Sequence, residues 1–267
     1  MTKAQLVEQI RSKKSYLCVG LDTDESKLPA HLLTADDPVF EFNKQIIDAT
    51  ADFCVSYKIN TAFYEANGLR GWQSLEKTVN YIPSHHLKIA DAKRGDIGNT
   101  ASQYAKAFFE TLSFDAITVA PYMGADSVKP FLAYKNKWTI LLGLTSNSGA
   151  RDFELLKYDD EFLFERVMRT AVGWGDSENL MFVVGATQTE MFRRIRDLVP
   201  AHFFLVPGVG AQGGSLADIS VRAANAETGL LVNSSRAIIY ASSSADFAQQ
   251  AQQVAMEYQQ EMIRYIR

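Results

Sequence analysis

The stretch LKIADAKRGDIGNT, Leu87–Thr100, contains the pattern that decides the fold. Its apolar first half predicts a strand over Leu87–Asp91, because a parallel strand buried on both faces is near-continuously apolar. Charged residues and two glycines follow, and then an amphipathic segment, Thr100–Leu112, predicts a helix. The stretch therefore predicts a strand followed by a helix, with charged side chains at the junction between them.

The same strand-then-helix pattern recurs along the chain. Eight strands are predicted, at Tyr16–Leu21, Phe53–Lys58, Leu87–Asp91, Ala116–Ala120, Thr139–Leu144, Leu180–Gly185, His202–Pro207 and Gly229–Asn233. Helical patterns between them include Val39–Thr50, Thr100–Leu112, Glu161–Trp174 and Thr187–Leu198. Eight such units in 267 residues predict an α/β fold, the (β/α)8 TIM barrel, whose usual length is about 250 residues. An open doubly wound sheet is the alternative.

The two ends of the chain predict packing helices. Residues 1–14 have the pattern of an opening helix that would cap the barrel floor, and residues 245–267 that of a long closing helix. Between them the chain has no linker rich in proline, glycine or serine, no repeat and no block of like charges. We therefore expect residues 1–267 to form a single domain.

Composition restricts the function classes. A net charge of −4 argues against a nucleic-acid or anionic-membrane partner, which usually selects a basic protein. The chain has no signal-peptide pattern and no apolar run of bilayer length, so we expect a cytoplasmic protein. Cys18 and Cys54 lie in apolar runs and are expected to be buried, inert thiols. The four histidines have no ligand spacing, so we expect loop or surface positions for them and no metal site.

Polar residues follow six of the predicted strands. In a barrel of this kind the chemistry takes place at the carboxyl ends of the strands. Side chains that are far apart in sequence would therefore converge on one mouth. They are Asp22, Lys58, Asp91, Lys93, Thr145, Ser146, Gly208 and the run Ser234–Arg236.

Two lysines and two aspartates suggest a row of alternating charge. Asp91 and Lys93 are two residues apart, so an extended strand end would point both into the mouth. Lys58 would add a second ammonium beside Asp91, and Asp96 a further carboxylate. Carboxylates favour the charged form of a lysine, which makes it a proton donor and a poor Schiff-base nucleophile. The alternative is a surface salt bridge followed by a helix N-cap.

A glycine-rich segment and an arginine suggest a phosphate site. Four glycines lie within Pro207–Gly214, directly after the seventh strand, where backbone N–H groups could approach an anion. Arg236 follows the eighth strand, and the loops after strands seven and eight of such barrels often bind phosphate. A flexible lid is the alternative. The spacing of Gly208, Gly210 and Gly213 fits a dinucleotide fingerprint, but no ribose-binding acid follows clearly, so NAD is not expected.

The motifs together resemble one enzyme family. Asp-x-Lys-x-x-Asp-Ile after the third strand, here DAKRGDIGNTA, is similar to the signature of the orotidine 5′-monophosphate decarboxylases, in a bacterial branch. The resemblance continues in GLDTD, SYKIN, LTSN, VPGVGAQGG and NSSR, in order along the chain. It implies decarboxylation of orotidine 5′-monophosphate (OMP) to UMP without metal or organic cofactor. It also implies a homodimer whose subunits share active sites.

The resemblance also implies roles for the residues of the reaction centre. Lys93 would protonate C6 as carbon dioxide leaves, and Asp91 would lie against the departing carboxylate. Lys58 and Asp22 would contact the ribose hydroxyls and steady the charged row. Asp96, together with Thr100, would reach the active site of the partner subunit.

Three further contacts are implied at the base and the phosphate. Ser146 would hydrogen-bond the pyrimidine edge. Gln212 and Arg236 would hold the phosphate, with Gly210 in the glycine-rich loop beside them. The sequence leaves open whether Arg94 has a role beyond the surface.

Two rival functions follow from the same residues. The group of 3-keto-L-gulonate 6-phosphate decarboxylase and hexulose-phosphate synthase shares Asp-x-Lys-x-x-Asp but uses magnesium to hold an enediolate. LTSN and the long DAKRGDIGNTA form weigh against that group. A catalytically silent nucleotide-binding sensor is the other rival, but binding alone would not need the whole set of alternating charges.

Overall fold

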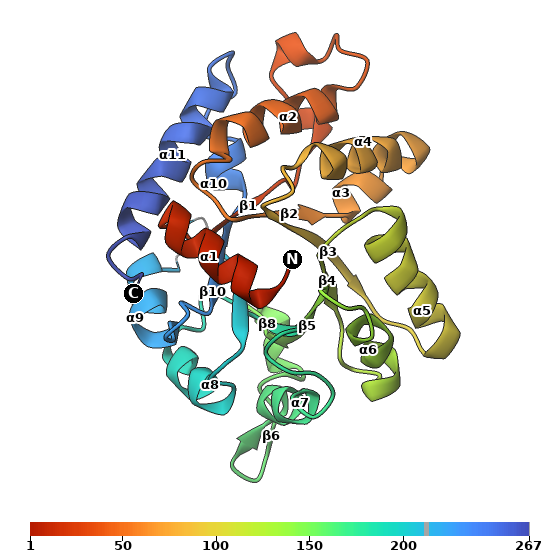
Figure 1. Ribbon diagram of the computed structural model, residues 1–267, viewed down its shortest axis with the longest axis vertical. Helices are drawn as coiled ribbons and strands as arrows, with labels where there is room; N and C mark the ends of the chain where they lie inside the picture. Colours follow the sequence, from red (N-terminus) through yellow and green to blue (C-terminus); the bar gives the residue numbers. More distant parts are fainter. Residues whose placement is uncertain (211–213, 267) are drawn as a thin grey trace.

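The computed structural model, which describes residues 1–210 and 214–266, is a closed barrel of parallel strands surrounded by helices (Figure 1). The strands follow the order β1-β10-β9-β8-β5-β4-β3-β2 around the barrel. They are β1 Leu17–Gly20, β2 Ser56–Asn60, β3 Leu87–Arg94, β4 Ala116–Val119, β5 Trp138–Leu144, β8 Leu180–Val184, β9 Phe203–Pro207 and β10 Leu230–Ser234. The predicted TIM barrel and all eight predicted strands are confirmed, and the open sheet is excluded.

Helices cover the outside of the barrel. They are α1 Lys3–Lys13, α2 Pro38–Thr50, α3 Ala62–Glu65, α4 Gly68–Tyr81, α5 Gly98–Lys106, α6 Ala125–Leu132, α7 Leu163–Ala171, α8 Phe192–Leu198, α9 Leu216–Ala223, α10 Arg236–Ile239 and α11 Phe247–Met262. Short turns of 3-10 helix are η1 Glu25–Lys27, η2 Ala30–Leu32, η4 Ser148–Arg151 and η5 Thr189–Met191, and η3 Ala107–Thr111 is a π-helical turn. A small antiparallel hairpin, β6 Lys157–Tyr158 and β7 Glu161–Phe162, projects from the barrel beside α7.

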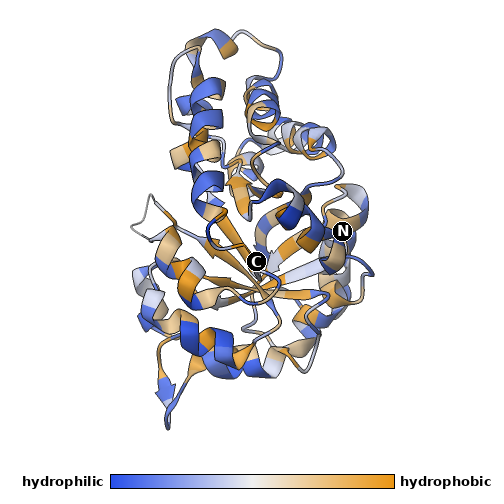
Figure 2. Cartoon of the chain, turned by 60° about the vertical axis from the view of Figure 1, so that its left-hand side comes forward, coloured by the Kyte–Doolittle hydropathy of each residue, from blue (hydrophilic) through white to orange (hydrophobic). Residues whose placement is uncertain are grey.

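The core lies in and around the barrel wall. All residues of β1, β4 and β8 are buried, which explains why these strands are apolar without alternation. Figure 2 shows the strands as largely hydrophobic and the helices as hydrophobic on one side, with hydrophilic residues facing outward. Burial on both faces therefore accounts for the pattern from which the strands were predicted.

The opening helix closes the floor of the barrel, as expected. Thr2 accepts a hydrogen bond from the Gln5 backbone N–H and so caps α1, which lies across the centre of the barrel in Figure 1. The Met1 ammonium contacts Asp115 Oδ1 at 3.3 Å, and Trp138 Nε1 donates to the Met1 carbonyl at 2.9 Å. The start of the chain is thus tied to the residues that precede β4 and begin β5.

Several predicted boundaries differ from the structure. The second strand begins at Ser56 and not at Phe53. The helix predicted over Thr100–Leu112 stays α-helical only to Lys106 and continues as the π turn η3. The helix predicted from Glu161 begins at Leu163, because Glu161 and Phe162 pair with Lys157 and Tyr158 in the hairpin. Non-local pairing and packing decided these ends, while local composition had predicted the elements.

Two of the four histidines are buried, which corrects the expectation that they lie at the surface. His86 is fully buried and His202 is 6% exposed, although both lie in connecting segments, just before β3 and β9, so the expectation of surface positions is wrong for these two. Burial lowers the pKa of each imidazole to about 4. Cys18 and Cys54 are buried and unpaired, as expected, and burial raises the pKa of their thiols to about 12 and about 11.

None of the helices in the described part of the chain combines the length and apolarity that a bilayer-spanning segment requires.

Candidate active site

The carboxyl end of β3 is kinked where it enters the mouth of the barrel. The pairing of β3 with β4 shifts register between Ala90 and Arg94, and Lys93 has a left-handed backbone conformation with φ of 46°. A residue other than glycine seldom adopts this conformation without support from its surroundings. Here the Lys93 N–H donates to Thr118 Oγ1 of β4 at 2.9 Å. The kink, and not a plain extended strand, turns Lys93 toward Asp91.

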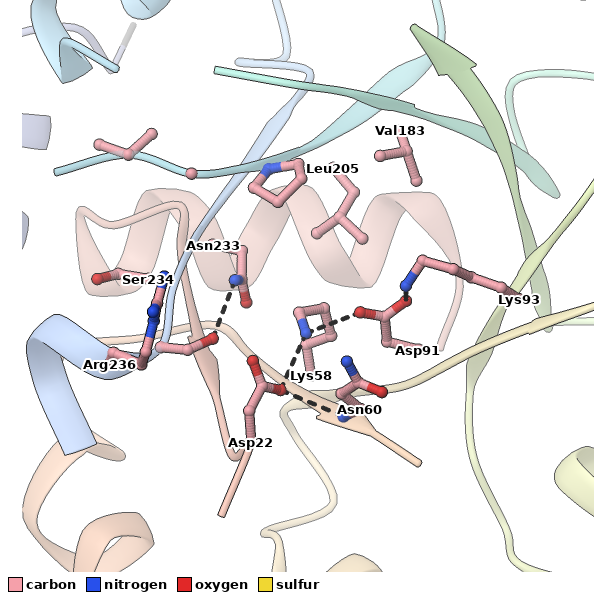
Figure 3. A pocket seen from close by; sticks show the side chains of 14 residues that line it. Asp22, Lys58, Asn60, Asp91, Lys93, Val183, Leu205, Asn233, Ser234 and Arg236 are labelled. Carbon is pink, nitrogen blue, oxygen red and sulfur yellow. Dashed lines mark hydrogen bonds and ion pairs between the residues drawn. The ribbon is translucent and has the colours of Figure 1, made fainter. Parts of the chain in front are cut away.

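Four charged side chains form a continuous row in the mouth (Figure 3). Lys58 Nζ lies 3.2 Å from Asp22 Oδ1 and 2.9 Å from Asp91 Oδ2. Lys93 Nζ lies 2.6 Å from the other carboxylate oxygen of Asp91. The predicted alternation of charge is therefore present, but Asp22 extends the row at the Lys58 end, and Asp96 of the same chain forms no ion pair with Lys93 at the other end.

Burial and charge act together on this row. Burial alone would raise the pKa of Asp91, but the ammonium groups of Lys58 and Lys93 outweigh it and lower that pKa to about 2. Burial would likewise lower the pKa of Lys58, and the carboxylates of Asp22 and Asp91 reverse the shift and raise it. Asp91 and Lys58 are thus both charged near neutral pH. The Lys93 side chain is 50% exposed, against 4% for Lys58, so Lys93 is the more accessible of the two ammonium groups.

A cavity extends from this row to the ends of β9 and β10. Besides the four charged residues, its walls are formed by Asn60, Val183, Leu205, Pro207, Gly208, Val209, Asn233, Ser234, Ser235 and Arg236. The lining therefore combines a charged side, an apolar side from β8 and β9, and an arginine. Such a mixture suits a ligand with a flat organic part and an anionic part. Among the described residues, no three His, Cys, Asp or Glu side chains gather in a geometry that could hold a metal ion.

Three residues of the site were missed by the reading of the sequence. Asn60 lies two residues after Lys58 and pairs in register with Asp91, so the period of two could have identified it. Asn233 lines the cavity from the end of β10, and its Nδ2 donates to Ser235 Oγ at 3.3 Å. Thr118 is 1% exposed and donates to Asp91 Oδ1 at 3.1 Å. A polar residue inside an apolar strand was the only sequence signal for Thr118, and its partner lies on another strand.

The arginine and the glycine-rich loop are only partly brought together. Arg236 lines the cavity and forms no ion pair with any other described residue. Gly208 lines it too, with φ of 96°, a conformation that favours glycine. Gly210 instead lines a neighbouring hollow, where a Cβ atom would lie 2.7 Å from the Tyr258 hydroxyl. Gln212 lies outside the described residues.

The segment after β5 lies beside the cavity, and its residues Thr145 and Ser146 are not among those that form the cavity wall. Ser146 is half-buried and packs on Gly185 at the end of β8, where a Cβ atom would come within 2.6 Å of the Ser146 nitrogen. β8 also carries Val183, which does line the cavity. Ser146 is therefore adjacent to the apolar side of the site.

Asp96 and Thr100 do not join the charged row of their own chain. The Asp96 carboxylate accepts from the Ile97 N–H at 2.8 Å and forms no ion pair with the described residues, and Thr100 is exposed at the start of α5. Arg94 turns away from the mouth, pairs with Glu65 and stacks over Tyr104 and Phe108. Its contacts attach the end of β3 to α3, α5 and η3, a role that the sequence had left open.

Comparisons with known proteins agree on one family. A sequence model described as "Orotidine 5′-phosphate decarboxylase / HUMPS family" matches residues 15–253. The chain is 60% identical to the orotidine 5′-phosphate decarboxylase of Flavobacterium johnsoniae over 269 residues, which is 100% of this chain and 98% of that protein.

Solved structures show the same likeness. The OMP decarboxylase of Leishmania donovani superposes with a TM-score of 0.84 at 35% identity, over 99% of both chains. The UMP synthase of the same organism superposes with a TM-score of 0.85 at 37% identity, over 97% of this chain but only 56% of that longer one. With this fold, this row of charges and these relatives, the chain belongs to the orotidine 5′-phosphate decarboxylase / HUMPS family.

Proposed function

We propose that Lys93 is the proton donor with which this chain decarboxylates orotidine 5′-monophosphate. The chain is a carboxy-lyase that converts OMP to UMP and carbon dioxide. The observation that carries the assignment of Lys93 is its half-exposed ammonium, 2.6 Å from Asp91 at the cavity wall. The family model covers two kinds of enzyme. The near relatives are named as OMP decarboxylases, which favours this function over that of the sugar-phosphate enzymes.

The reaction needs charge at one carbon of the substrate. The bond between C6 and the carboxylate breaks, its electron pair stays on C6, and carbon dioxide leaves. The Lys93 ammonium stabilises the developing negative charge and then transfers a proton to C6, which gives UMP. Solvent returns the proton to Lys93. All of these groups are side chains of the protein, so we propose that the reaction needs no metal or organic cofactor.

The other charges of the row position the substrate. Asp91, ionised because its pKa is lowered to about 2, lies against the substrate carboxylate and disfavours the bound ground state relative to the carbanion. Lys58 and Asp22 contact the ribose hydroxyls. Their mutual contact at 3.2 Å supports this role, because it holds both groups in place before the substrate binds.

The remaining cavity residues divide between phosphate and base. Arg236, Gln212 and the glycine-rich loop with Gly210 bind the phosphate. The unpaired Arg236 at the cavity wall supports this placement. Ser146 hydrogen-bonds the pyrimidine edge above the apolar side of the cavity, where Val183 and Leu205 contact the ring.

A homodimer completes the site. Asp96 and Thr100 lie outside their own charged row, and exposed apolar side chains occur at the same ends of the strands: Ile97 follows Asp96, and Tyr122 and Met123 follow β4. Ile97 is 55% exposed, Tyr122 is 87% exposed and Met123 is 45% exposed. A second copy of the chain would cover these side chains and bring Asp96 and Thr100 to the partner's cavity.

Turnover by a Lys93→Ala variant tests the proton donor. We expect UMP to bind with near-normal affinity, because the phosphate and ribose contacts lie elsewhere, while OMP turnover falls by more than the ~10²–10⁴-fold of a general acid alone. Near-normal turnover would exclude Lys93 as the donor.

Exhaustive chelation should leave the wild-type rate unchanged, and a loss of activity that magnesium restores would exclude the cofactor-free reaction.

A further inference from the structure

Thr145, at the end of β5, is held by side chains on both sides of its peptide. Its N–H donates to Glu154 Oε2 at 2.7 Å, and its carbonyl accepts from Gln188 Nε2 at 3.0 Å. The Thr145 hydroxyl lies 2.9 Å and 3.0 Å from the two carboxylate oxygens of Glu154. Glu154 therefore contacts the main chain and the side chain of Thr145 at once.

Glu154 is itself anchored at a distance from the site. It lies in the segment that connects β5 to α7, and its carbonyl accepts from the Phe164 N–H in the first turn of α7 at 3.1 Å. The carboxylate reaches back to the strand end from that anchor. Hydrogen bonds to an ionised carboxylate are shorter and about twice as strong as neutral ones, so this contact resists displacement of Thr145.

The residue after Thr145 is Ser146, to which we assign the pyrimidine edge. Ser146 rests on Gly185, where even a methyl group would overlap it, since a Cβ atom there would lie 2.7 Å from Ser146 Cβ. One side of Ser146 is thus set by the close approach of β8, and the preceding peptide is set by Glu154 and Gln188. A shift of Thr145 would move Ser146 directly.

We propose that Glu154 is a positioning residue for recognition of the base. It fixes Thr145 and thereby holds Ser146 against the pyrimidine, without touching the substrate itself. The inference rests on the proposed role of Ser146. Loss of the Glu154 carboxylate should weaken ligands that carry the pyrimidine and spare ligands that consist of sugar and phosphate only, because Arg236 lies on the far side of the cavity from Val183 of β8, the strand that Ser146 adjoins (Figure 3).

Binding of two ligands by matched variants tests the proposal. Glu154→Ala should weaken UMP by about five- to tenfold, the effect of losing a placed hydrogen bond, and raise KM for OMP to a similar extent. Binding of ribose 5-phosphate should stay unchanged. Glu154→Gln should recover most of the UMP affinity, because an amide oxygen still accepts from the Thr145 N–H. Asp152→Ala, an exposed carboxylate in the same segment, is the control and should match the wild type.

A double-mutant cycle separates this role from that of Ser146. If Glu154 acts through Ser146, adding Glu154→Ala to Ser146→Ala should cost little further UMP affinity. Additive losses of UMP affinity would overturn the proposal for Glu154 while leaving Ser146 as the base contact.

Two results with the single variants would also overturn it: equal losses of affinity for UMP and for ribose 5-phosphate in Glu154→Ala, or a Glu154→Gln variant that binds UMP as weakly as Glu154→Ala. If Ser146→Ala leaves UMP affinity unchanged, the assignment of Ser146 itself is wrong.

Discussion

At the scale of single residues, the position of Asp91 depends on a threonine from the next strand. Thr118 Oγ1 donates to Asp91 Oδ1 at 3.1 Å and accepts from the Lys93 N–H at 2.9 Å. One hydroxyl thus contacts both the carboxylate and the strained backbone of the lysine. Lys93, the proposed proton donor, and its counter-ion Asp91 are therefore oriented by the same buried hydroxyl.

Replacing this hydroxyl by a methyl group should damage catalysis more than folding. Thr118→Val keeps the shape of the side chain but leaves the Lys93 N–H without its partner. We expect kcat for OMP to fall about tenfold or more, by the usual cost of one lost hydrogen bond in a catalytic site. Steady-state kinetics with OMP would measure the change.

Thr139→Val is the matched control. Thr139 is equally buried, on the adjacent strand β5, and its hydroxyl has no hydrogen-bond partner among the described residues. Removing an unsatisfied hydroxyl should leave kcat unchanged and keep or raise the melting temperature. Equal kinetics of Thr118→Val and the wild type would mean that the kink at Lys93 does not depend on Thr118.

The second residue-scale prediction concerns Arg236. A charge-assisted hydrogen bond is worth roughly 1.5–3 kcal/mol, so Arg236→Ala should lower kcat/KM for OMP by at least about tenfold. Orotidine, which lacks the phosphate, should be a poor substrate for both enzymes and should hardly distinguish them. If the variant turns over orotidine and OMP with equal losses, Arg236 supports the fold or the pyrimidine site and not the phosphate.

At the scale of elements, the barrel separates its two ends by function. Charged side chains occupy the carboxyl ends of the strands, while the segments that lead into β3 and β9 bury the histidines His86 and His202. Neither Nδ1 nor Nε2 of His202 has a hydrogen-bond partner among the described residues. Burial and the nearby charges of Arg196 and Lys3 keep its imidazole neutral and lower its pKa to about 4.

These histidines make the stability of the fold depend on pH. The pKa of each is about 4 in the folded chain and about 6.5 in the unfolded chain, so between these values the unfolded state binds more protons. The free energy of unfolding should therefore fall as the pH drops from about 6.5 to about 4, by at most about 1.4 kcal/mol per pH unit for each histidine. Urea unfolding at several pH values would measure this slope.

A His202→Phe variant identifies the contribution of one of them. The ring of His202 already lies near the ring of Phe182, with centroids 5.5 Å apart, so an aromatic replacement suits the space. The slope between pH 6.5 and 4 should become smaller in this variant. A slope that stays the same would show that His202 is already protonated or accessible in the folded protein.

At the scale of the whole molecule, the first and last long helices are in contact, and a second copy of the chain is proposed to complete the active site. Gln259 Nε2 of α11 donates to the carbonyl of Lys13, the last residue of α1, at 2.6 Å. This contact supports our proposal that residues 1–267 act as one domain. Asp96 and Thr100, in contrast, lie outside the charged row of their own chain and are proposed to serve a partner.

Mixed dimers test the shared site. Lys93→Ala and Asp96→Ala subunits should each be nearly inactive alone, but a heterodimer would combine wild-type Lys93 and wild-type Asp96 in one of its two sites. We therefore expect mixing to restore a substantial fraction of OMP turnover, once subunit exchange is confirmed by a size or mass measurement. Exchange without any recovery would mean that Asp96 acts within its own chain.

Local sequence was sufficient for the elements and for part of the site. Apolar runs predicted all eight strands, because burial on both faces leaves a continuous signature within a few residues. Lys58, Asp91 and Lys93 were found for a similar reason, since each stands at a strand end and the barrel collects such ends at one mouth. The family resemblance added roles that no local pattern contains.

Tertiary structure decided which of these residues meet. The register of β2 on β3 places Asn60 opposite Asp91, and that of β3 on β4 brings Thr118 to the kink at Lys93. Hydrogen bonds between strands that are distant in sequence set these registers, so no periodicity within one strand reveals them. The same limit hid the anchoring of Thr145 by Glu154 and the burial of His86. Sequence by itself thus determined the strands and the charges that end them, while barrel closure decided which partners those charges have.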